Sequence, residues 1–535
     1  MKKNVRKRNV EKQKEIRRLM RLGVHILIVL AVYLFTTYGY LLIGEPWYNA
    51  TFYAFQTFAL NYEPVEVGHW VIYLGRVLCP LATASVLFVL LKDVYRRLRD
   101  FYRSRTGATA IYYDNDAVEE ICKSFKRPVC MKDKINFWAA DHVLMFDKDV
   151  DSLAFYERMK PGLDDGKNKV YIKLEEMESK LLRANNVHFF NKNEIISRLY
   201  WQERHLQKFF MEGKKNVKIA IIGFGALGEK LLDYALMNNI YSLNQSIEYH
   251  IWGDAKLYVE MLEGVDFMNS DRVFWHQADW KEHWKENVDS GSEKVSLADF
   301  DRIIVTTEPD LELIQALLYL HPEIQIDYYD PHGAELPAAF AGDRLTAFGR
   351  NKDILTEENI KTDVLYRTAK EVNFAYMVNT DTKGEYAWNR EDTEEKMRAE
   401  WMKLDGFTKG SNIAAADYEV IRKLVVEILG INPEEMIAHY YETMKAIDAW
   451  KENGEAEPAP EFEKELETLA EMEHVRWSRY HFVNHWRYKQ TEDGKKDKLH
   501  RWHPLLIPYS DLTEEEKQKD RVNIIQLFEE KKSHK

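Results

Sequence analysis

The chain has 535 residues, enough for roughly three or four domains with buried cores, and its formal net charge of −12 conceals a strong asymmetry. Residues 1–105 contain 17 Lys or Arg against 7 Asp or Glu, a net charge of about +10, so the remaining 430 residues carry about −22. This acidic part argues against a nucleic-acid partner, because binding to phosphates needs a basic surface.

The cysteine and histidine content predicts no metal site. Cys79, Cys122 and Cys130 lack metal-site spacing and cannot make a disulfide framework, which fits a reducing, cytosolic environment for most of the chain. His321 and His332 lie near acidic residues but match no metal motif.

Two apolar stretches open the chain. Residues 22–44 have no formal charge and are long enough to cross the ~30 Å hydrocarbon core of a bilayer. Residues 67–91 are also long enough but contain Arg76 and Pro80, and Pro80 is expected to kink the helix. Basic clusters flank the pair while the loop between them has no Lys or Arg, so we predict a two-pass protein of the inner or cell membrane with both termini in the cytoplasm.

The loop between these stretches, WYNATFYAFQTFALNYEPVEVGHW, is aromatic and apolar. The spacing of its phenylalanines predicts a short pore helix that ends at Thr57. The order of span, apolar re-entrant segment and span resembles two-span tetrameric cation channels. Ala59 and Asn61 stand where a potassium filter would have glycines, so potassium selectivity is not expected. The candidate pore residues are Thr57, Asn61, Glu63 and Arg76. Alternatively, the loop is an ordinary extracellular hairpin and Arg76 extends outward to the interface.

Alternating strands and helices follow from Ala108 to about Leu206, which predicts a parallel sheet with helices on its faces. Expected strands cover 108–113, 142–146, 169–174 and 187–190, and expected helices cover 116–125 and 175–185. Asp114 and Asp116 occupy the first turn and would repel a phosphate. We therefore expect this copy to be a structural or dimerising unit.

A second copy, from Val217 to about Tyr329, begins VKIAIIGFGALGEKLLDYALMNN. Gly223 permits a tight turn, Gly225 lets a pyrophosphate approach the backbone, and Gly228 allows the helix to pack closely on the strand. The amino terminus of the helix offers free N–H groups to an anion.

Polar residues follow two later strands of this copy. Asp254 is placed to bind ribose hydroxyls, and Thr306 and Thr307 end a strand at the edge where ligands bind. These residues and the glycines predict a site for a nucleotide such as NAD, ATP or a signalling nucleotide. The alternative is a nucleotide fold with an empty or vestigial site.

Two such folds after membrane spans resemble the tandem regulator-of-potassium-conductance (TrkA-N) arrangement of ligand-gated channels. The resemblance covers about residues 108–330 and rests on element order, GFGALG and IIVTTEPD. It implies a cytoplasmic ring whose ligand-dependent motion pulls on the inner helices.

The carboxy-terminal stretch ELETLAEMEHVRWSRYHFVNHWRY, with the later HP and PY pairs and the KDR triplet, resembles the ryanodine-receptor (RyR) repeat over about 60 residues. An earlier stretch with Trp401, Leu404, Ser411, Asn412 and Asp417 looks like a degenerate first copy, with Asn373 where histidine is expected.

The residue types of the RyR stretch allow a ligand pocket. Arg476 and Arg521 are expected to hold a phosphate, and Trp477, Trp486 and Trp502 to stack on a base. The candidate ligand residues are Glu473, His474, Arg476, Trp477, Trp486, Tyr488, His503 and Arg521. In the alternative interpretation these side chains only join two antiparallel helices.

The fold class expected is a membrane α unit of two transmembrane helices, then tandem α/β Rossmann-like domains, then a mostly α RyR region. The predicted boundaries are a basic amino terminus (1–22), two transmembrane helices (23–91) with the re-entrant or extracellular loop 45–67, a basic linker (92–107), a degenerate TrkA-N-like domain (108–210), a nucleotide-binding TrkA-N-like domain (211–345), a degenerate RyR-like repeat (346–450), a linker (451–465) and the RyR domain (466–535).

The function expected is a ligand-gated ion channel or membrane effector that senses a nucleotide or nucleotide-derived signal, in stress or antiphage signalling by analogy alone. The expected partners are copies of the chain in a homotetramer, the ligand and the lipid bilayer. Alternatives are a membrane-anchored scaffold with vestigial nucleotide folds and an NAD-dependent membrane oxidoreductase. No catalytic residue is predicted, because no His, Lys and Tyr constellation follows the nucleotide fold.

Overall fold

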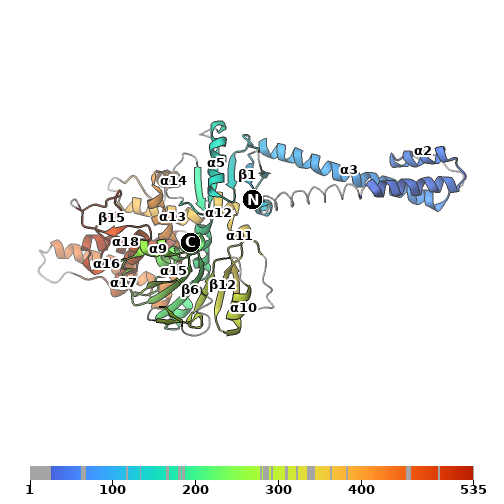
Figure 1. Ribbon diagram of the computed structural model, residues 1–535. Helices are drawn as coiled ribbons and strands as arrows, with labels where there is room; N and C mark the ends of the chain where they lie inside the picture. Colours follow the sequence, from blue (N-terminus) through green and yellow to red (C-terminus); the bar gives the residue numbers. More distant parts are fainter. Residues whose placement is uncertain are drawn as a thin grey trace. The chain divides into compact units, whose positions relative to one another are not determined.

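The protein forms two compact units, Met1–Thr106 and Gly107–Lys535 (Figure 1). The computed structural model describes residues 24, 26–61, 68–105, 107–115, 118–132, 134–163, 168–178, 182, 187–277, 280, 288–290, 293–307, 311–320, 323–333, 344–361, 364–380, 384–388, 390–452, 460–491 and 494–533.

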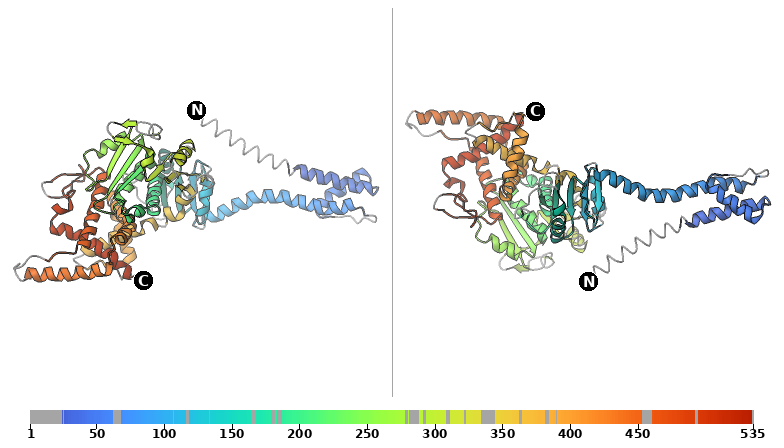
Figure 2. Two further views of the ribbon diagram at one scale, coloured as in Figure 1. Left: turned by 90° about the horizontal axis from the view of Figure 1, so that it is seen from below. Right: turned by 90° about the horizontal axis from the view of Figure 1, so that it is seen from above.

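The amino-terminal unit contains a helix over residues 26–42, the short α2 (Trp47–Phe58) and the long α3 (Trp70–Arg105) (Figure 2). Small residues let the first helix and α3 approach closely. A Cβ on Gly75 would lie 2.6 Å from Thr36 Oγ1, and Thr36 Oγ1 lies 3.3 Å from Cys79 Sγ. The helix predicted to end at Thr57 is present as α2.

Of the helices in the described part of the chain, none combines the length and the apolar character needed to cross a membrane. The two spans expected over 22–44 and 67–91 include residues outside that part, namely 22, 23, 25 and 67. Both spans stay predictions.

The first sheet of the second unit has five parallel strands in the order β2-β1-β3-β4-β5. The strands are β1 (Thr109–Tyr113), β2 (Pro128–Met131), β3 (Asp141–Met145), β4 (Lys169–Leu174) and β5 (Val187–Asn191), with helices α4 (Val118–Ile121), α5 (Asp149–Met159) and α6 (Lys192–Glu203). The parallel sheet predicted from the alternation is confirmed. This strand order is that of flavodoxin-like doubly wound sheets.

The prediction of a helix over 175–185 is wrong for the part of this range that the structure describes. Residues 175–177 form a bend after β4. The Asp149 carboxylate accepts hydrogen bonds of 2.9, 2.9 and 2.7 Å from the backbone N–H groups of Glu175, Glu176 and Met177. This side chain takes the donors that would start a helix, in the way that Asp competes with regular structure.

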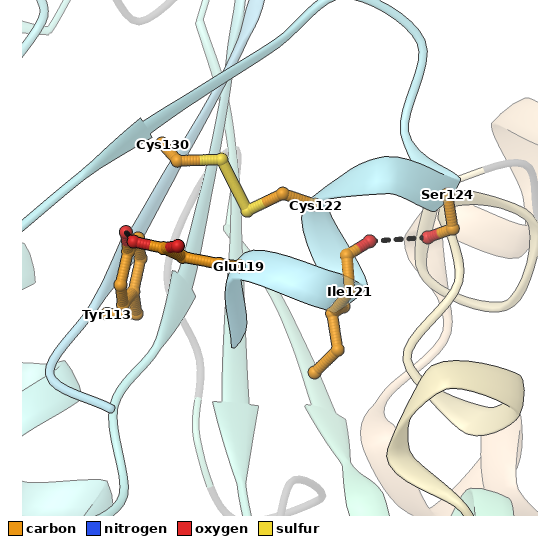
Figure 3. Close-up of a disulfide and its surroundings, with 6 residues drawn as sticks. All are labelled: Tyr113, Glu119, Ile121, Cys122, Ser124 and Cys130. Atoms are coloured by element: carbon orange, nitrogen blue, oxygen red, sulfur yellow. Dashed lines mark hydrogen bonds between the residues drawn. A yellow bond between two sulfur atoms is a disulfide. The ribbon is translucent and has the colours of Figure 1, made fainter. Parts of the chain in front are cut away.

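The cysteine prediction also needs correction, because Cys122 and Cys130 form a disulfide (Figure 3). The bond joins the short helical turn after α4 to the edge strand β2, eight residues apart in the sequence. In the same region Tyr113 OH donates to Glu119 Oε1 at 3.3 Å, and Ser124 Oγ donates to Ile121 O at 2.8 Å (Figure 3). A sequence separation of eight residues gave no sign of this pairing.

The second sheet has six parallel strands in the order β13-β12-β11-β6-β7-β8. The strands are β6 (Asn216–Phe224), β7 (Ser246–Gly253), β8 (Arg272–His276), β11 (Arg302–Val305), β12 (Gln325–Tyr329) and β13 (Leu345–Phe348); β9 (Val288–Ser290) and β10 (Glu293–Val295) form a separate antiparallel pair. Read from β8, this is the strand order 3-2-1-4-5-6 of dinucleotide-binding sheets.

Helices connect and follow the strands of this sheet. The short α7 (Gln207–Met211) precedes β6. The connecting helices are α8 (Ala226–Asn238), α9 (Lys256–Leu262) and α10 (Leu311–Leu320), and the later ones are α11 (Asn351–Ile354), α12 (Glu357–Lys361), α13 (Val364–Thr380), α14 (Thr393–Lys403), α15 (Gly406–Leu429), α16 (Pro433–Glu452), α17 (Lys464–Val483) and α18 (Glu514–Ser533). Asp405 caps α15 by accepting from Thr408 N at 2.8 Å, and Gly430, with φ 65°, ends it.

The carboxy-terminal helices share one apolar core with the second sheet. Both α15 and α17 pack against α8. Buried residues from the sheet, such as Ile219 and Tyr249, and from the helices, such as Val425 and Val475, belong to one cluster. The second sheet and the predicted RyR region therefore form one packed body rather than separately linked domains.

Candidate functional site

The glycine turn joins β6 to α8 at the carboxyl edge of the second sheet. Gly223 has φ +89°, a left-handed conformation that favours glycine, and a Cβ there would lie 2.3 Å from Thr307 Cγ2. The buried Thr306 hydroxyl donates a hydrogen bond of 2.6 Å to Gly223 O. The neighbouring strand β11 thus holds the turn, and only glycine fits at position 223.

The other predicted residues meet at this turn. A Cβ on Gly225 would meet nothing closer than 4.0 Å, so a ligand has room to approach the backbone there. A Cβ on Gly228 would lie 3.2 Å from Phe224 Cδ2, so glycine lets α8 pack closely on β6. Asp254 is exposed, and its N–H donates to Phe224 O at 3.2 Å. The three glycines, Asp254 and both threonines therefore share one edge of the sheet.

An acidic residue works against an anion at this turn. Glu229 lies in the first turn of α8, and burial together with the nearby Asp233 raises the pKa of its carboxyl. A carboxylate in that position opposes the attraction of the helix amino terminus for anions. Residues 308–310, which follow Thr307, lie outside the described part of the chain.

A second candidate site is a cavity of about 290 Å³ in the helical region, near the lower limit of the usual range for ligand pockets. Four helices contribute its lining: α13 and α15 from the predicted first repeat, and α17 and α18 from the second. The polar lining residues are Tyr376, Ser411, Asn412, Arg422, Glu473, His474, Arg476, Trp477, Glu516, Lys519, Asp520, Asn523 and Gln526.

Two guanidinium groups face one carboxylate in this cavity. Glu473 accepts hydrogen bonds from Arg476 Nε at 3.0 Å and Arg476 Nη2 at 2.8 Å, and also from Arg422 Nη2. All three side chains are buried. Burial alone raises the pKa of Glu473, but the charges of Arg476 and Arg422 outweigh it and hold the pKa below its ordinary value. The triad therefore carries an excess positive charge.

The same guanidinium groups retain unused donors. Arg476 Nη1 and Arg422 Nε are buried and have no hydrogen-bond partner among the described residues. An unpaired buried donor on a charged group is costly, so each donor is available to an acceptor that enters the cavity. Arginine is well suited to bind carboxylates and phosphates because its donors form a planar fork.

A histidine and an aspartate form a second polar pair in the lining. His474 Nε2 donates to Ile507 O at 2.8 Å, and its Nδ1 lies 3.7 Å from Asp520 Oδ2. Burial raises the pKa of Asp520 although His474 lowers it. The Trp477 ring lies beside His474, with ring centroids 5.6 Å apart. This part of the lining offers hydrogen-bond acceptors and an aromatic ring.

The structure brings four of the eight predicted RyR ligand residues into the cavity: Glu473, His474, Arg476 and Trp477. The other four lie elsewhere. Trp486 is buried against Phe407, and Tyr488 is exposed on β14 (Arg487–Tyr488).

His503 and Arg521 have structural contacts instead of lining the cavity. His503, on β15 (Trp502–His503), packs edge-on against Trp477, and burial lowers its pKa to about 4. Arg521 binds Glu467 at 2.6 Å and Glu514 at 2.9 Å, so it joins α18 to α17, and unlike Arg476 it does not line the cavity. For these residues the helix-joining interpretation fits better.

Sequence reasoning missed several lining residues. Arg422 had no signal of its own because it lies 51 residues from its partner Glu473. Asp520 is the middle residue of the Lys-Asp-Arg run in the RyR stretch, and its position on α18 opposite α17 could have identified it. Ser411 and Asn412 were noted only as marks of the first copy, although both line the cavity.

Buried ion pairs connect the cavity helices to the sheets. Asp417 on α15 accepts from Arg198 of α6 at 2.7 and 3.0 Å. Arg479 on α17 lies 2.9 Å from Asp271 Oδ2, just before β8, and donates to Leu236 O on α8 at 3.0 Å. A displacement of α15 or α17 would therefore disturb contacts of both sheets.

The predicted pore residues belong to the amino-terminal unit. Thr57 is buried, and its hydroxyl donates to Tyr53 O of its own helix at 2.8 Å. Asn61 is exposed after α2, Arg76 is half-buried on α3, and Glu63 lies outside the described residues.

Comparison with known proteins identifies one domain. Residues 458–529 match the RyR domain family, which confirms the RyR domain expected near the carboxy terminus. No curated protein matches the chain.

Two solved structures resemble parts of the chain. The crystal structure of a GsuK mutant is 13% identical and covers 64% of this chain and 98% of its own, with a TM-score of 0.31. A glycerate dehydrogenase related protein from Thermoplasma acidophilum is 11% identical and covers 44% and 89%, with a TM-score of 0.18. At these TM-scores neither resemblance carries a functional argument.

Proposed function

We propose that the protein is a ligand-responsive membrane effector whose RyR region binds a small anionic ligand, a nucleotide or a nucleotide-derived signal. The observation that carries the proposal is the cavity with a buried nitrogen on Arg476 that has no hydrogen-bond partner within the described part of the chain. An anionic group entering the cavity would offset the excess charge of the triad and accept from that nitrogen.

The size and lining of the cavity favour a mononucleotide over a dinucleotide. A volume of about 290 Å³ is small for a dinucleotide. Trp477 offers a surface for a heterocyclic base, while Asp520 and Asn523 offer acceptors for its amino groups.

The amino-terminal unit supports the membrane part of the proposal. Large apolar side chains are exposed along its helices, among them Leu27, Leu34, Phe55, Trp70 and Leu81. Apolar surface of this extent needs a cover of lipid or protein. We propose that lipid and further copies of the chain, in a homotetramer, provide that cover and that ligand binding opens a pore.

Calorimetric titration of the full-length protein in detergent with AMP, ATP, NAD and inorganic phosphate tests the ligand class. AMP should bind the wild type, and Arg476→Gln should weaken AMP binding by at least about tenfold because the anion loses its main donor. Arg367→Gln, a control at an exposed arginine of α13, should bind AMP like the wild type. Binding that is the same in all three proteins would refute a ligand site in the cavity.

Membrane fractionation and particle mass test the effector half. A tetramer that sediments with membranes and passes ions when AMP is added supports the gated pore. A membrane-bound monomer or dimer that passes no ions supports the scaffold alternative.

The glycine turn supports a second candidate, a dinucleotide at the second sheet. Its strand order and the open backbone at Gly225 favour this ligand, whereas Glu229 opposes it. An oxidoreductase would further require NAD to be reduced on addition of a substrate, measured by absorbance.

A further inference from the structure

We propose that Glu473 is an internal competitor for the anionic group of the ligand: the phosphate of the ligand binds Arg476 and Arg422 where the Glu473 carboxylate now lies. This inference rests on the proposed function, because it concerns the same cavity. It adds a regulatory role for Glu473, since its displacement also breaks a link between two helices.

The geometry of the Glu473, Arg476 and Arg422 triad shows which donors a phosphate would share with Glu473. The Glu473 carboxylate occupies the Nε and Nη2 donors of Arg476, the two positions with which arginine binds oxyanions in a bidentate manner. A carboxylate held in this way has the same donors that a phosphate would need. Glu473 and a ligand phosphate are therefore alternative occupants of one fork.

The charges of the triad favour a phosphate over the Glu473 carboxylate. With Glu473 in place, two guanidinium groups share one carboxylate, so the triad has one positive charge more than negative charge. A phosphate with two negative charges neutralises both guanidinium groups, whereas the single charge of Glu473 neutralises one. The phosphate is thus the better electrostatic match for the two guanidinium groups once Glu473 moves aside, since the lowered pKa of Glu473 keeps its carboxylate charged.

The position of Glu473 gives its displacement a consequence. Its bond to Arg422 joins α17 to α15, and its bonds to Arg476 lie within α17. When a phosphate takes the guanidinium groups, the direct α15–α17 link is replaced by one through the ligand. Helix α15 also carries Asp417, the partner of Arg198. Replacement of the Glu473 carboxylate by a phosphate therefore changes the contacts of α15, the helix that is paired with α6.

Glu473→Gln tests the competition in the full-length protein, with Glu471→Gln on the same helix but outside the cavity as the matched control. We expect Glu473→Gln to bind AMP about tenfold more tightly than the wild type and to bind inorganic phosphate more tightly as well. Adenosine, which lacks the phosphate, should bind both proteins equally. Glu471→Gln should stay within about twofold of the wild type for AMP.

A second variant guards against a folding defect in Glu473→Gln. Arg422→Gln leaves one guanidinium group against one carboxylate. Thermal melts of Glu473→Gln and Arg422→Gln report whether each variant is folded. We expect Arg422→Gln to lose at least about tenfold in AMP affinity, because the excess positive charge is gone.

The possible outcomes separate this inference from the proposed function. Weaker or equal AMP and phosphate binding by Glu473→Gln overturns the competition, even if the wild type binds AMP. Unchanged AMP affinity in Arg422→Gln also overturns it. If the wild type binds no nucleotide but Glu473→Gln binds phosphate, the competition stands and the nucleotide ligand is wrong.

Discussion

The glycine turn and the helical cavity both contain the residue types of a nucleotide site, but they differ in how their polar groups are satisfied. At the glycine turn, Thr306 already bonds to Gly223 O, and the acidic Glu229 stands at the start of α8. In the cavity, two buried guanidinium groups share one carboxylate and keep donors for which the described residues provide no partner.

This difference shows why a glycine pattern alone is weak evidence for a bound nucleotide. Gly223 and Gly228 are explained by the fold, because one has a left-handed backbone and the other lets α8 pack on β6. Arg422 and Arg476 each keep a buried donor that has no partner among the described residues, and leaving such a donor unbonded is costly. Because both side chains line the cavity, these donors favour a ligand there over one at the glycine turn.

The largest effect is expected where the cavity helices are tied to α6. Asp417→Ala leaves Arg198 buried without its partner, which should lower the free energy of unfolding by about 3–5 kcal/mol. Urea denaturation measures this loss. The double variant Arg198→Met with Asp417→Leu should recover most of it, and a single variant with near-wild-type stability would contradict a tight connection between cavity and sheets.

The second largest effect is expected from acid, which should destabilise the RyR region. Burial lowers the pKa of His481 to about 3, so this side chain is neutral in the folded protein while it becomes protonated near pH 6.5 in the unfolded chain. The unfolded state then binds more protons below pH 6.5, and stability falls as pH falls from 6.5 towards the folded pKa.

The loss between pH 6.5 and 4.5 should reach about 2–3 kcal/mol, because one pKa unit corresponds to 1.36 kcal/mol. Thermal melts across this range, compared with those of His481→Gln, isolate the contribution. A slope of stability against pH that is the same in both proteins would refute the assignment.

A moderate effect is expected for Gly223→Ala at the other site. The alanine would need φ near +89° and would place its Cβ against Thr307, so unfolding free energy should fall by about 1–3 kcal/mol. Chemical denaturation measures this change. AMP affinity should stay as in the wild type, because the proposed AMP site is the cavity and not the turn.

The smallest effect is expected for Gly225→Ala, which separates the two sites most cleanly. A Cβ on Gly225 meets nothing closer than 4.0 Å, so stability should change by less than about 0.5 kcal/mol. The added methyl group would still block a phosphate from the backbone. Calorimetric titration with AMP and NAD should give wild-type affinities for a cavity ligand, and a loss specific to Gly225→Ala would move the site to the turn.

The sequence predicted the repeated local patterns well and the long-range partners poorly. The apolar run of β6, the glycines and the short α2 follow from local periodicity and turn chemistry, so these elements could be placed before the structure was known. The Arg422–Glu473 and Arg198–Asp417 pairs join residues 51 and 219 positions apart, and no local pattern predicts them.

Some predicted ligand residues failed for a related reason. Arg521 and Trp486 have residue types suited to a ligand, but tertiary packing gives Arg521 two carboxylate partners and buries Trp486 against Phe407. Residue type suggests what a side chain can bind, whereas the fold decides whether its donors are already used.

Hydrogen–deuterium exchange of the full-length protein with and without AMP tests the central claim most directly, because it reports on both regions in one experiment. We predict slower exchange in the peptides of α15, α17 and α18 and unchanged exchange over residues 216–230. Slower exchange confined to the glycine turn, or no change in either region, would contradict a ligand site in the cavity.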